Sequence, residues 1–248
     1  MASGDIASAR QALAPSGTLR ATINVGNPLL ARRDDTGAVS GISVDLARLL
    51  AGDLQVPLHL SVFETASKAV SAVAAGLADI GFFARDPDRA GLIAFTAPYL
   101  LIEGCYLVRE ASSLQSIAEV DMQGLRLTVG RASAYDLFLS REIRHAVIER
   151  APTSTVVVET FLQTEADVAA GVREQLEADA ARFGGLRLLP GRFMVIEQAM
   201  GVARSRGEFA ADVLADFVER MTAEGIIANL PSSCRVAETT GLTLRRAD

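Results

Sequence analysis

The stretch GFFARDPDRAGLIAFTAPY, residues 81–99, places a cluster of charges inside apolar chain. The charged residues, grouped around Pro87, are Arg85, Asp86, Asp88 and Arg89. Two interpretations are open. The cluster is either a solvated turn in which Arg89 pairs with a neighbouring aspartate, or a turn that aims an arginine at an anion, which a guanidinium grips through parallel hydrogen bonds.

The chain before this stretch alternates strand and helix patterns. Short apolar runs predict strands over 16–26, 56–62 and 78–83. Between them, apolar residues at helical spacing predict helices over 42–54 and 66–76. This alternation is typical of a parallel sheet covered by helices.

A second α/β series follows the stretch. The expected elements are an extended segment over 99–109, a strand over 125–130, helices over 133–149 and 153–165, a strand over 166–172, a helix over 173–183, a strand over 186–191, an extended segment over 193–203 and a helix over 208–227. Two successive α/β units joined by extended segments predict two lobes with a cleft between them. We expect residues 1–107 plus 201–248 to form one lobe and 108–200 the other.

Composition excludes several classes of partner. The 248-residue chain carries a net charge of −6, which argues against nucleic acid and anionic membranes. Mean hydropathy is +0.27, yet no uncharged apolar run of about 18 residues occurs. Aromatic residues make up 5% and Trp is absent, so no base-stacking platform is evident.

Motifs for catalysis or cofactor binding are missing from the sequence. No P-loop, G-x-G-x-x-G or HExxH occurs, and neither His59 nor His145 is paired with a nucleophile. We therefore expect no catalytic residue, metal or cofactor. Cys105 and Cys234 lack metal-ligand spacing, and a disulfide between them stays open. The start lacks signal-peptide features, so the chain is cytoplasmic if Met1 is its native start, or an export signal has been removed.

Several motifs occur in the order of one known family. They are GAVSGISVDLARLL, AVAAGLADIGFF, DPDRAGLIAFTAPY, EADVAAGV and ADFVERMTAEGIIANL, within roughly residues 17–230. In this order they resemble the amino-acid-type (family 3) periplasmic solute-binding proteins of ABC importers. The resemblance implies an α/β, two-lobe type II periplasmic-binding fold that closes on a ligand in its cleft. It also implies a small carboxylate-bearing ligand, a membrane permease partner, a periplasmic location and a monomer.

The resemblance also assigns site residues. Arg89 takes the position of the arginine that grips a ligand carboxylate. Arg131, Ala132 and Ser133 form the strand-to-helix turn whose backbone receives the same group. Ser133 is equally suited to capping the helix.

The rest of the expected pocket has few aromatic residues. Gly26 and Ala66 stand where aromatic residues often sandwich the ligand in the family. The other lining residues that we expect are Asn24, Asn27, Glu64, Phe82, Phe83, Ala84 and Gln198.

The sequence departs from the family where the ligand ammonium is bound. Val172 replaces the usual aspartate and is followed by Arg173, which either receives a second carboxylate or lies on the surface. Asp179 substitutes only if the alignment shifts by seven residues. Glu64 either supplies a replacement anion or caps the helix that follows it.

Two other functions use the same fold. One is a lyase similar to cyclohexadienyl dehydratases, for which Glu174 or Glu64 would be the general acid. The other is a ligand-sensing domain.

Overall fold

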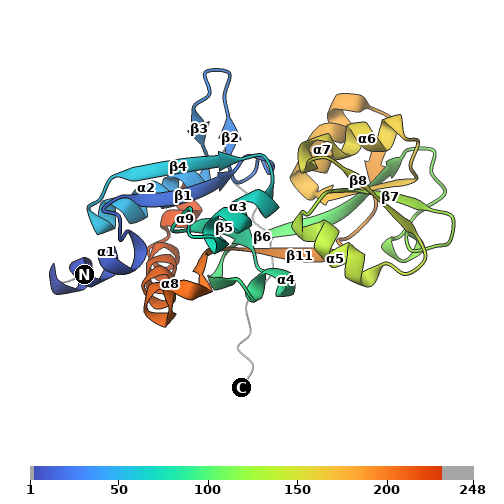
Figure 1. Ribbon diagram of the computed structural model, residues 1–248. Helices are drawn as coiled ribbons and strands as arrows, with labels where there is room; N and C mark the ends of the chain where they lie inside the picture. The colour runs from blue at the N-terminus through green and yellow to red at the C-terminus, as the bar shows by residue number, and fades with distance from the viewer. Residues whose placement is uncertain (1–2, 231–248) are drawn as a thin grey trace.

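Two lobes joined by a pair of long strands make up the molecule (Figure 1). The computed structural model describes residues 3–230. Strands β6 (Ile93–Arg109) and β11 (Met194–Ala203) run antiparallel to each other and pass from one lobe into the other. They lie in a seven-stranded sheet of order β5-β11-β6-β9-β7-β8, with β10 paired to β6.

The first lobe contains the predicted strand–helix alternation. Strand β1 (Leu19–Asn24) pairs in parallel with β4 (Leu58–Phe63), and Ala21 forms a parallel bridge to Ile80 just before β5 (Gly81–Ala84). The helices of this lobe are α1 (Ser3–Leu13), α2 (Ile42–Leu54), α3 (Ala66–Ala74), α4 (Pro87–Ala90), α8 (Glu208–Ala223) and α9 (Ile226–Asn229). A hairpin of β2 (Arg32–Arg33) and β3 (Val39–Ser40) projects from it (Figure 1).

The second lobe repeats the α/β architecture. Its strands are β7 (Arg126–Gly130), β8 (Val147–Ala151), β9 (Val168–Val172) and β10 (Leu186–Leu188), and its helices are α5 (Ala134–Glu142), α6 (Val157–Gln163) and α7 (Arg173–Phe183). Short 3₁₀ turns occupy Ile117–Glu119, Ser154–Val156 and, in the first lobe, Arg204–Arg206. Strand β7 runs parallel to both β8 and β9, so the ends of all three strands meet at one edge of the sheet.

The predicted helix over 133–149 is wrong in its second half. Helix α5 ends at Glu142, and Val147–Ala151 forms strand β8 instead. The carboxylate of Asp121 accepts hydrogen bonds from the backbone amides of Arg144 (2.9 Å), His145 (2.7 Å) and Ala146 (2.9 Å). These amides are therefore not available to continue the helix, and the chain turns into an edge strand.

Buried apolar side chains hold each lobe together. On α8 the apolar stripe buries Leu214, Phe217, Val218 and Met221, each 3% exposed or less. Burying such a side chain contributes about 1.5–3 kcal/mol. In the second lobe, Phe161 and Leu176 pack in a separate cluster between the sheet and helices α6 and α7.

The pairing between the two crossing strands is irregular over one short stretch, where the register shifts twice. The register of β11 against β6 shifts between Gln198 and Ala199 and again between Ala199 and Gly201. Such irregularities bend a strand locally. The residue boundaries predicted for the lobes stay a prediction.

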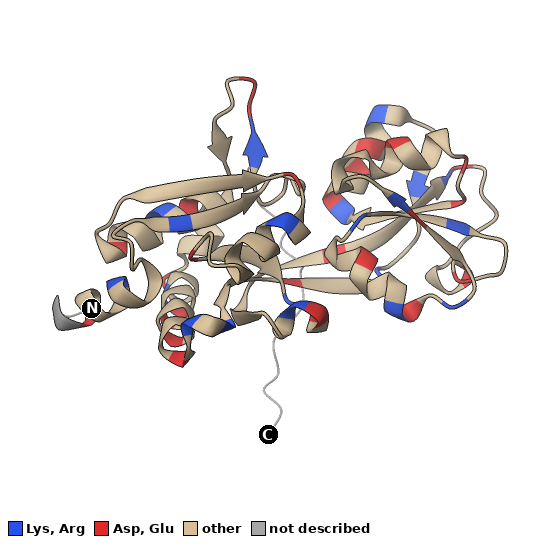
Figure 2. Cartoon of the chain, in the orientation of Figure 1, with Lys and Arg blue, Asp and Glu red and all other residues tan. Residues whose placement is uncertain are grey.

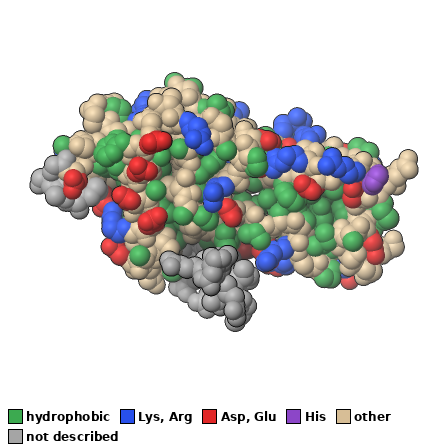
Figure 3. Space-filling view, turned by 90° about the horizontal axis from the view of Figure 1, so that it is seen from below, with side chains coloured by type: hydrophobic (Ala, Val, Ile, Leu, Met, Phe, Trp, Pro, Cys, Tyr) green, Lys and Arg blue, Asp and Glu red, His purple; other side chains and the backbone are tan. Residues whose placement is uncertain are grey.

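The face of the molecule in Figure 3 carries charges of both signs. On the part of the face in Figure 3 that the structure describes, acidic and basic side chains are interspersed with hydrophobic ones. Among the described helices, none combines the length and hydrophobicity needed to cross a bilayer.

Candidate functional site

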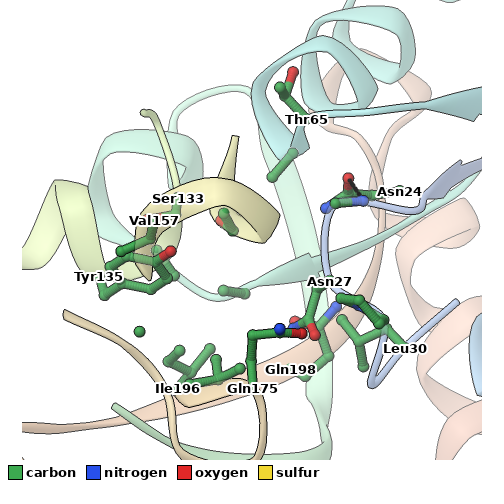
Figure 4. Close-up of a pocket in the computed structure, with 18 of the residues that line it drawn as sticks. Asn24, Asn27, Leu30, Thr65, Ser133, Tyr135, Val157, Gln175, Ile196 and Gln198 are labelled. Atoms are coloured by element: carbon green, nitrogen blue, oxygen red, sulfur yellow. Dashed lines mark hydrogen bonds between the residues drawn. The ribbon is translucent and has the colours of Figure 1, made fainter. Parts of the chain in front are cut away.

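A cavity of about 70 Å³ is lined by residues from both lobes and from the crossing strand β11. Figure 4 shows Asn24, Asn27 and Leu30 on one side of it and Ser133, Tyr135 and Val157 on the other. Other residues expected from the sequence that line it are Gly26, Glu64, Ala66, Phe82, Phe83, Ala84, Arg89, Arg131 and Gln198. Apolar walls with a few polar groups are typical of small-molecule sites.

Arg89 reaches this cavity from α4. The helix starts at Pro87, and the side chain of Asp86 caps it by accepting the amide of Asp88 at 2.9 Å. The Arg89 side chain is buried, with the residue 6% exposed. It donates to two carbonyl oxygens, Ala84 from Nη1 at 3.2 Å and Ala132 from Nη2 at 3.3 Å. Burial lowers the pKa of the guanidinium, which still stays protonated at neutral pH.

The aspartates near Arg89 pair with another arginine. Arg141 of α5 binds Asp86 Oδ2 through Nη2 at 2.9 Å and Asp88 Oδ2 through Nη1 at 2.9 Å. In Figure 2, charged positions are coloured on the ribbons of α4 and α5, in the region between the lobes. Arg85 pairs with Glu197 at 3.0 Å, and neither of these residues lines the cavity. Asp86 and Asp88 therefore form ion pairs of the kind expected in a solvated turn. Their partner is Arg141, however, and not Arg89.

The backbone amides of the turn before α5 are already hydrogen-bonded within the protein. Arg131 N donates to Ala151 O at 3.0 Å, Ala132 N to Asp136 Oδ2 at 2.7 Å, and Ser133 N to Gly130 O at 3.1 Å. Ser133 caps α5, because its hydroxyl accepts the amide of Asp136 at 3.0 Å. Arg131 and Ser133 line the cavity. Ala132, in the left-handed region at φ 55°, does not line it but presents its carbonyl to Arg89.

Glu64 lies at the exposed rim of the cavity. It forms an ion pair with Arg33 at 3.5 Å, and the cap of α3 is Thr65, not Glu64. The nearby Gly26 explains the missing aromatic residue. A Cβ atom built there would lie 2.3 Å from Glu64 O, so no side chain fits without moving the backbone.

Arg173 does not reach the cavity, contrary to its candidate role there. Its Nε donates to Glu103 Oε2 at 2.6 Å and its Nη2 to Gly191 O at 3.0 Å. Arg192 binds the other oxygen of Glu103, also at 2.6 Å. The side chain of Arg173 is thus hydrogen-bonded to β6 and to the segment before β11. Its neighbour Val172 lines the cavity instead.

Two polar residues of α7 also line the cavity: Gln175, which was not expected there, and Asp179, which was considered only under a shifted alignment. Asp179 is 6% exposed and accepts a hydrogen bond from Gln175 Nε2 at 3.0 Å. Their four-residue spacing places them on one face of the helix, but the sequence does not show that this face is buried. They lie four residues apart on either side of the buried Leu176, so all three lie on the inward face of the helix.

The acids considered for catalysis lie in different surroundings. Glu174 does not line the cavity. One of its oxygens is buried without a hydrogen-bond partner, and burial raises the pKa of the Glu174 carboxyl.

Within residues 3–230, no three His, Cys, Asp or Glu side chains are grouped to hold a metal ion. Cys105 is buried with a free thiol, while Cys234 lies outside the described residues.

Comparisons with known proteins place this architecture in a class. A profile of bacterial extracellular solute-binding proteins, family 3, matches residues 19–232. No curated protein matches the chain. Since the profile covers most of the sequence, the chain belongs to this family of solute-binding proteins.

Several solved structures have a similar fold. One is a putative binding component of an ABC transporter from Wolinella succinogenes complexed with lysine (TM-score 0.74, 21% identity, 86% of this chain and 93% of that one). A second is the amino acid ABC transporter substrate-binding protein AbpA from Streptococcus pneumoniae bound to L-arginine (0.75, 14%, 89% and 95%). A third is the ancestral amino acid-binding protein AncCDT-1, a precursor of cyclohexadienyl dehydratase (0.73, 17%, 86% and 93%).

Proposed function

We propose that this chain is the periplasmic solute-binding component of an ABC importer and that it binds a small carboxylate-bearing ligand, an amino acid or a related organic acid. The observation that carries the proposal is the state of Arg89. Its guanidinium is buried in the cavity wall, and among the described residues it forms no ion pair. A carboxylate in the cavity would supply the missing negative charge.

The lobes would close on the ligand. We propose the lobe boundaries 1–107 plus 201–248 and 108–200, with β6 and β11 as the connection. Arg89 supports closure because it belongs to the first lobe and donates to Ala132 of the second at 3.3 Å. A membrane permease that accepts the closed, monomeric protein is the partner that this function requires.

We propose a binding protein rather than an enzyme. A dehydratase would need a general acid beside its substrate. Glu174 lies outside the cavity lining, and Glu64 lies at the exposed rim, paired with Arg33. The AncCDT-1 resemblance concerns the fold alone at 17% identity.

Thermal shift measurements with single compounds test the proposal. We would add L-arginine, L-lysine, L-glutamine and glutarate separately to the purified protein and measure the rise in Tm. Any rise seen in the wild type should disappear in Arg89→Ala. Arg89→Lys, which keeps the charge but not the planar fork, should recover it only in part. Circular dichroism establishes that each variant is folded.

Arg85→Ala is the matched control. Arg85 lies four residues away, is exposed, and pairs with Glu197 outside the cavity. It should keep the ligand-induced shift. A folded Arg89→Ala protein with an unchanged shift would refute the assignment.

A further inference from the structure

Strand β4 leaves one side of its sheet open. Among the described residues it pairs only with β1, and Figure 1 shows it along the upper margin of the first lobe. Backbone groups point alternately to the two sides of a strand, and the carbonyl of Phe63 points to the β1 side, where it accepts the amide of Val25 at 2.9 Å. The open side therefore receives the N–H and C=O groups of Leu58, Leu60 and Val62. Between residues 3 and 230 these groups have no hydrogen-bond partner, so they can pair with an added strand.

This open edge lacks the charges that usually protect such a strand from pairing. Residues 54–63, LQVPLHLSVF, contain no Asp, Glu, Lys or Arg. The edge strand of the second lobe, β8, differs, because it carries Glu149 and Arg150, each in an ion pair. Strand β8 is thus protected against a further strand, whereas β4 is suited to one.

A groove of about 610 Å³ lies between β4 and α3. Ser61 and Phe63 line it from β4, Ser71 lines it from α3, and Leu77, which is 69% exposed, lines it from the turn after that helix. A strand added at β4 would send alternate side chains to this face of the sheet, and hence into the groove. Peptide recognition by strand addition uses both features, since backbone pairing supplies affinity and side-chain contacts supply specificity.

Lys68 gives the groove a positive charge. It is the only lysine of the chain and the only charged side chain among the described residues that line the groove. Lys68 is exposed and forms no ion pair within residues 3–230, and the acid nearest to it in sequence, Glu64, is paired with Arg33. An acidic side chain that enters the groove would therefore meet a cation without a partner of its own.

The charge of the groove distinguishes between possible occupants. In an antiparallel two-fold pair of β4 strands the two grooves meet, which would bring both copies of Lys68 into one space. Residues 231–248 carry three arginines against one glutamate and one aspartate, so they would also add positive charge. A partner with an acidic side chain instead neutralises Lys68.

We propose that the β4 edge and its groove bind an extended segment of a partner protein, with an acidic side chain of that segment opposite Lys68. The bound segment extends the sheet of the first lobe by one strand. The site shares no lining residue with the cavity around Arg89 and is independent of the ligand bound there.

Fluorescence anisotropy with three peptides, amidated and labelled with fluorescein, tests the charge of the site on the whole chain. The peptide TLTVEVTLT supplies a strand with one glutamate, TLTVQVTLT lacks its charge, and TLPPEPPLT keeps the charge but cannot pair as a strand. The glutamate strand should bind about threefold more tightly than the glutamine strand, and the proline peptide should not bind. No binding of the glutamate strand would overturn the inference.

Lys68→Gln should bind the two strand peptides equally. The matched control is Arg48→Gln, which removes an exposed cation from α2 outside the groove and should keep the preference for glutamate. Circular dichroism establishes that both variants are folded. An unchanged preference in folded Lys68→Gln would overturn the inference.

Amide hydrogen exchange, resolved by residue with NMR, tests the backbone pairing. The amides of Leu58, Leu60 and Val62 should exchange rapidly in the protein alone, and the glutamate strand should slow them about tenfold. The amides of His59 and Ser61, which face β1, should not change. Slow exchange of the first three without peptide, in dilute protein or together with a dimer in sedimentation, would mean that the chain itself or a second copy covers the edge, and would overturn the inference.

Discussion

Arg141 on α5 binds the carboxylate of Asp86, the residue that caps α4, with 2.9 Å between Nη2 and Oδ2. The Asp86 side chain is 5% exposed, so water screens this pair less than an ordinary surface pair. Arg141 also binds Asp88. Arg89 donates to the carbonyl oxygen of Ala132 in the second lobe. Helix α4 is therefore tied to the second lobe by charges and by a backbone carbonyl.

We expect Arg141→Ala to favour the open arrangement of the lobes. Without its partner, the carboxylate of Asp86 is left desolvated when the lobes are close. Ligand affinity should fall about tenfold, which corresponds to ~1.4 kcal/mol. Calorimetry measures the affinity, and small-angle scattering should give a larger radius of gyration than that of the wild type. Arg48→Ala, which removes an exposed pair within α2, should change neither quantity, and identical behaviour of the two variants would contradict this role.

Gly26→Ala should destabilise the fold. The added Cβ would lie 2.3 Å from Glu64 O, and relieving such an overlap costs about 1–3 kcal/mol. Urea denaturation should show a lower midpoint. The control is Gly52→Ala on α2, where no atom lies within 4 Å of the new Cβ. That change should raise stability by roughly 0.5–1 kcal/mol. A midpoint for Gly26→Ala at or above that of the wild type would refute the close approach.

Glu103 should make stability depend on acid pH. Hydrogen bonds from Arg192 and Arg173 hold the pKa of its carboxyl below the ordinary value. A depressed folded-state pKa contributes stability above the unfolded value of about 4.3, and this contribution is lost as pH falls through the folded value. Glu103→Gln should therefore be less stable than the wild type at pH 7, with the difference shrinking toward pH 3. Urea midpoints across this range measure it. A difference that stays constant with pH would count against the ion pairs.

Cys105 should react slowly with thiol reagents while the protein is folded. Burial raises the pKa of its thiol to about 11. At pH 8 roughly one thiol in a thousand is then the reactive thiolate. In a Cys234→Ser background, Ellman's reagent should label Cys105 orders of magnitude faster in urea than in buffer. Rapid stoichiometric labelling of the folded protein would show that the thiol is accessible.

The sequence predicts the order of elements well where local pattern and burial agree. The apolar stripe of α8 and the strands β5 and β9 follow directly from residue spacing. Strand β8 could not be predicted in the same way, because Val147, Ile148 and Ala151 also suit a helical face. What ends α5 is Asp121, more than 20 residues earlier in the chain, and such long-range capping leaves no local signal.

The candidate site was predictable in part for a similar reason. The position of Arg89 in the motif is local, and its contact with Ala132 follows from the closeness of two distant turns. Arg173 follows Val172 directly, but its long side chain turns to Glu103, a partner 70 residues away. Asp179 depends on which face of α7 is buried, and a helix with acidic residues on several faces does not reveal this from sequence alone.

The register shift in β11 affects how rotation of the lobes would change the cavity. Gln198 lies at that shift and also lines the cavity. If the lobes rotate about this point, the Gln198 amide turns with them and its distance from Arg89 and Asp179 changes. The shape of the cavity then changes together with the angle between the lobes. A compound of the wrong length would therefore stop the rotation part-way.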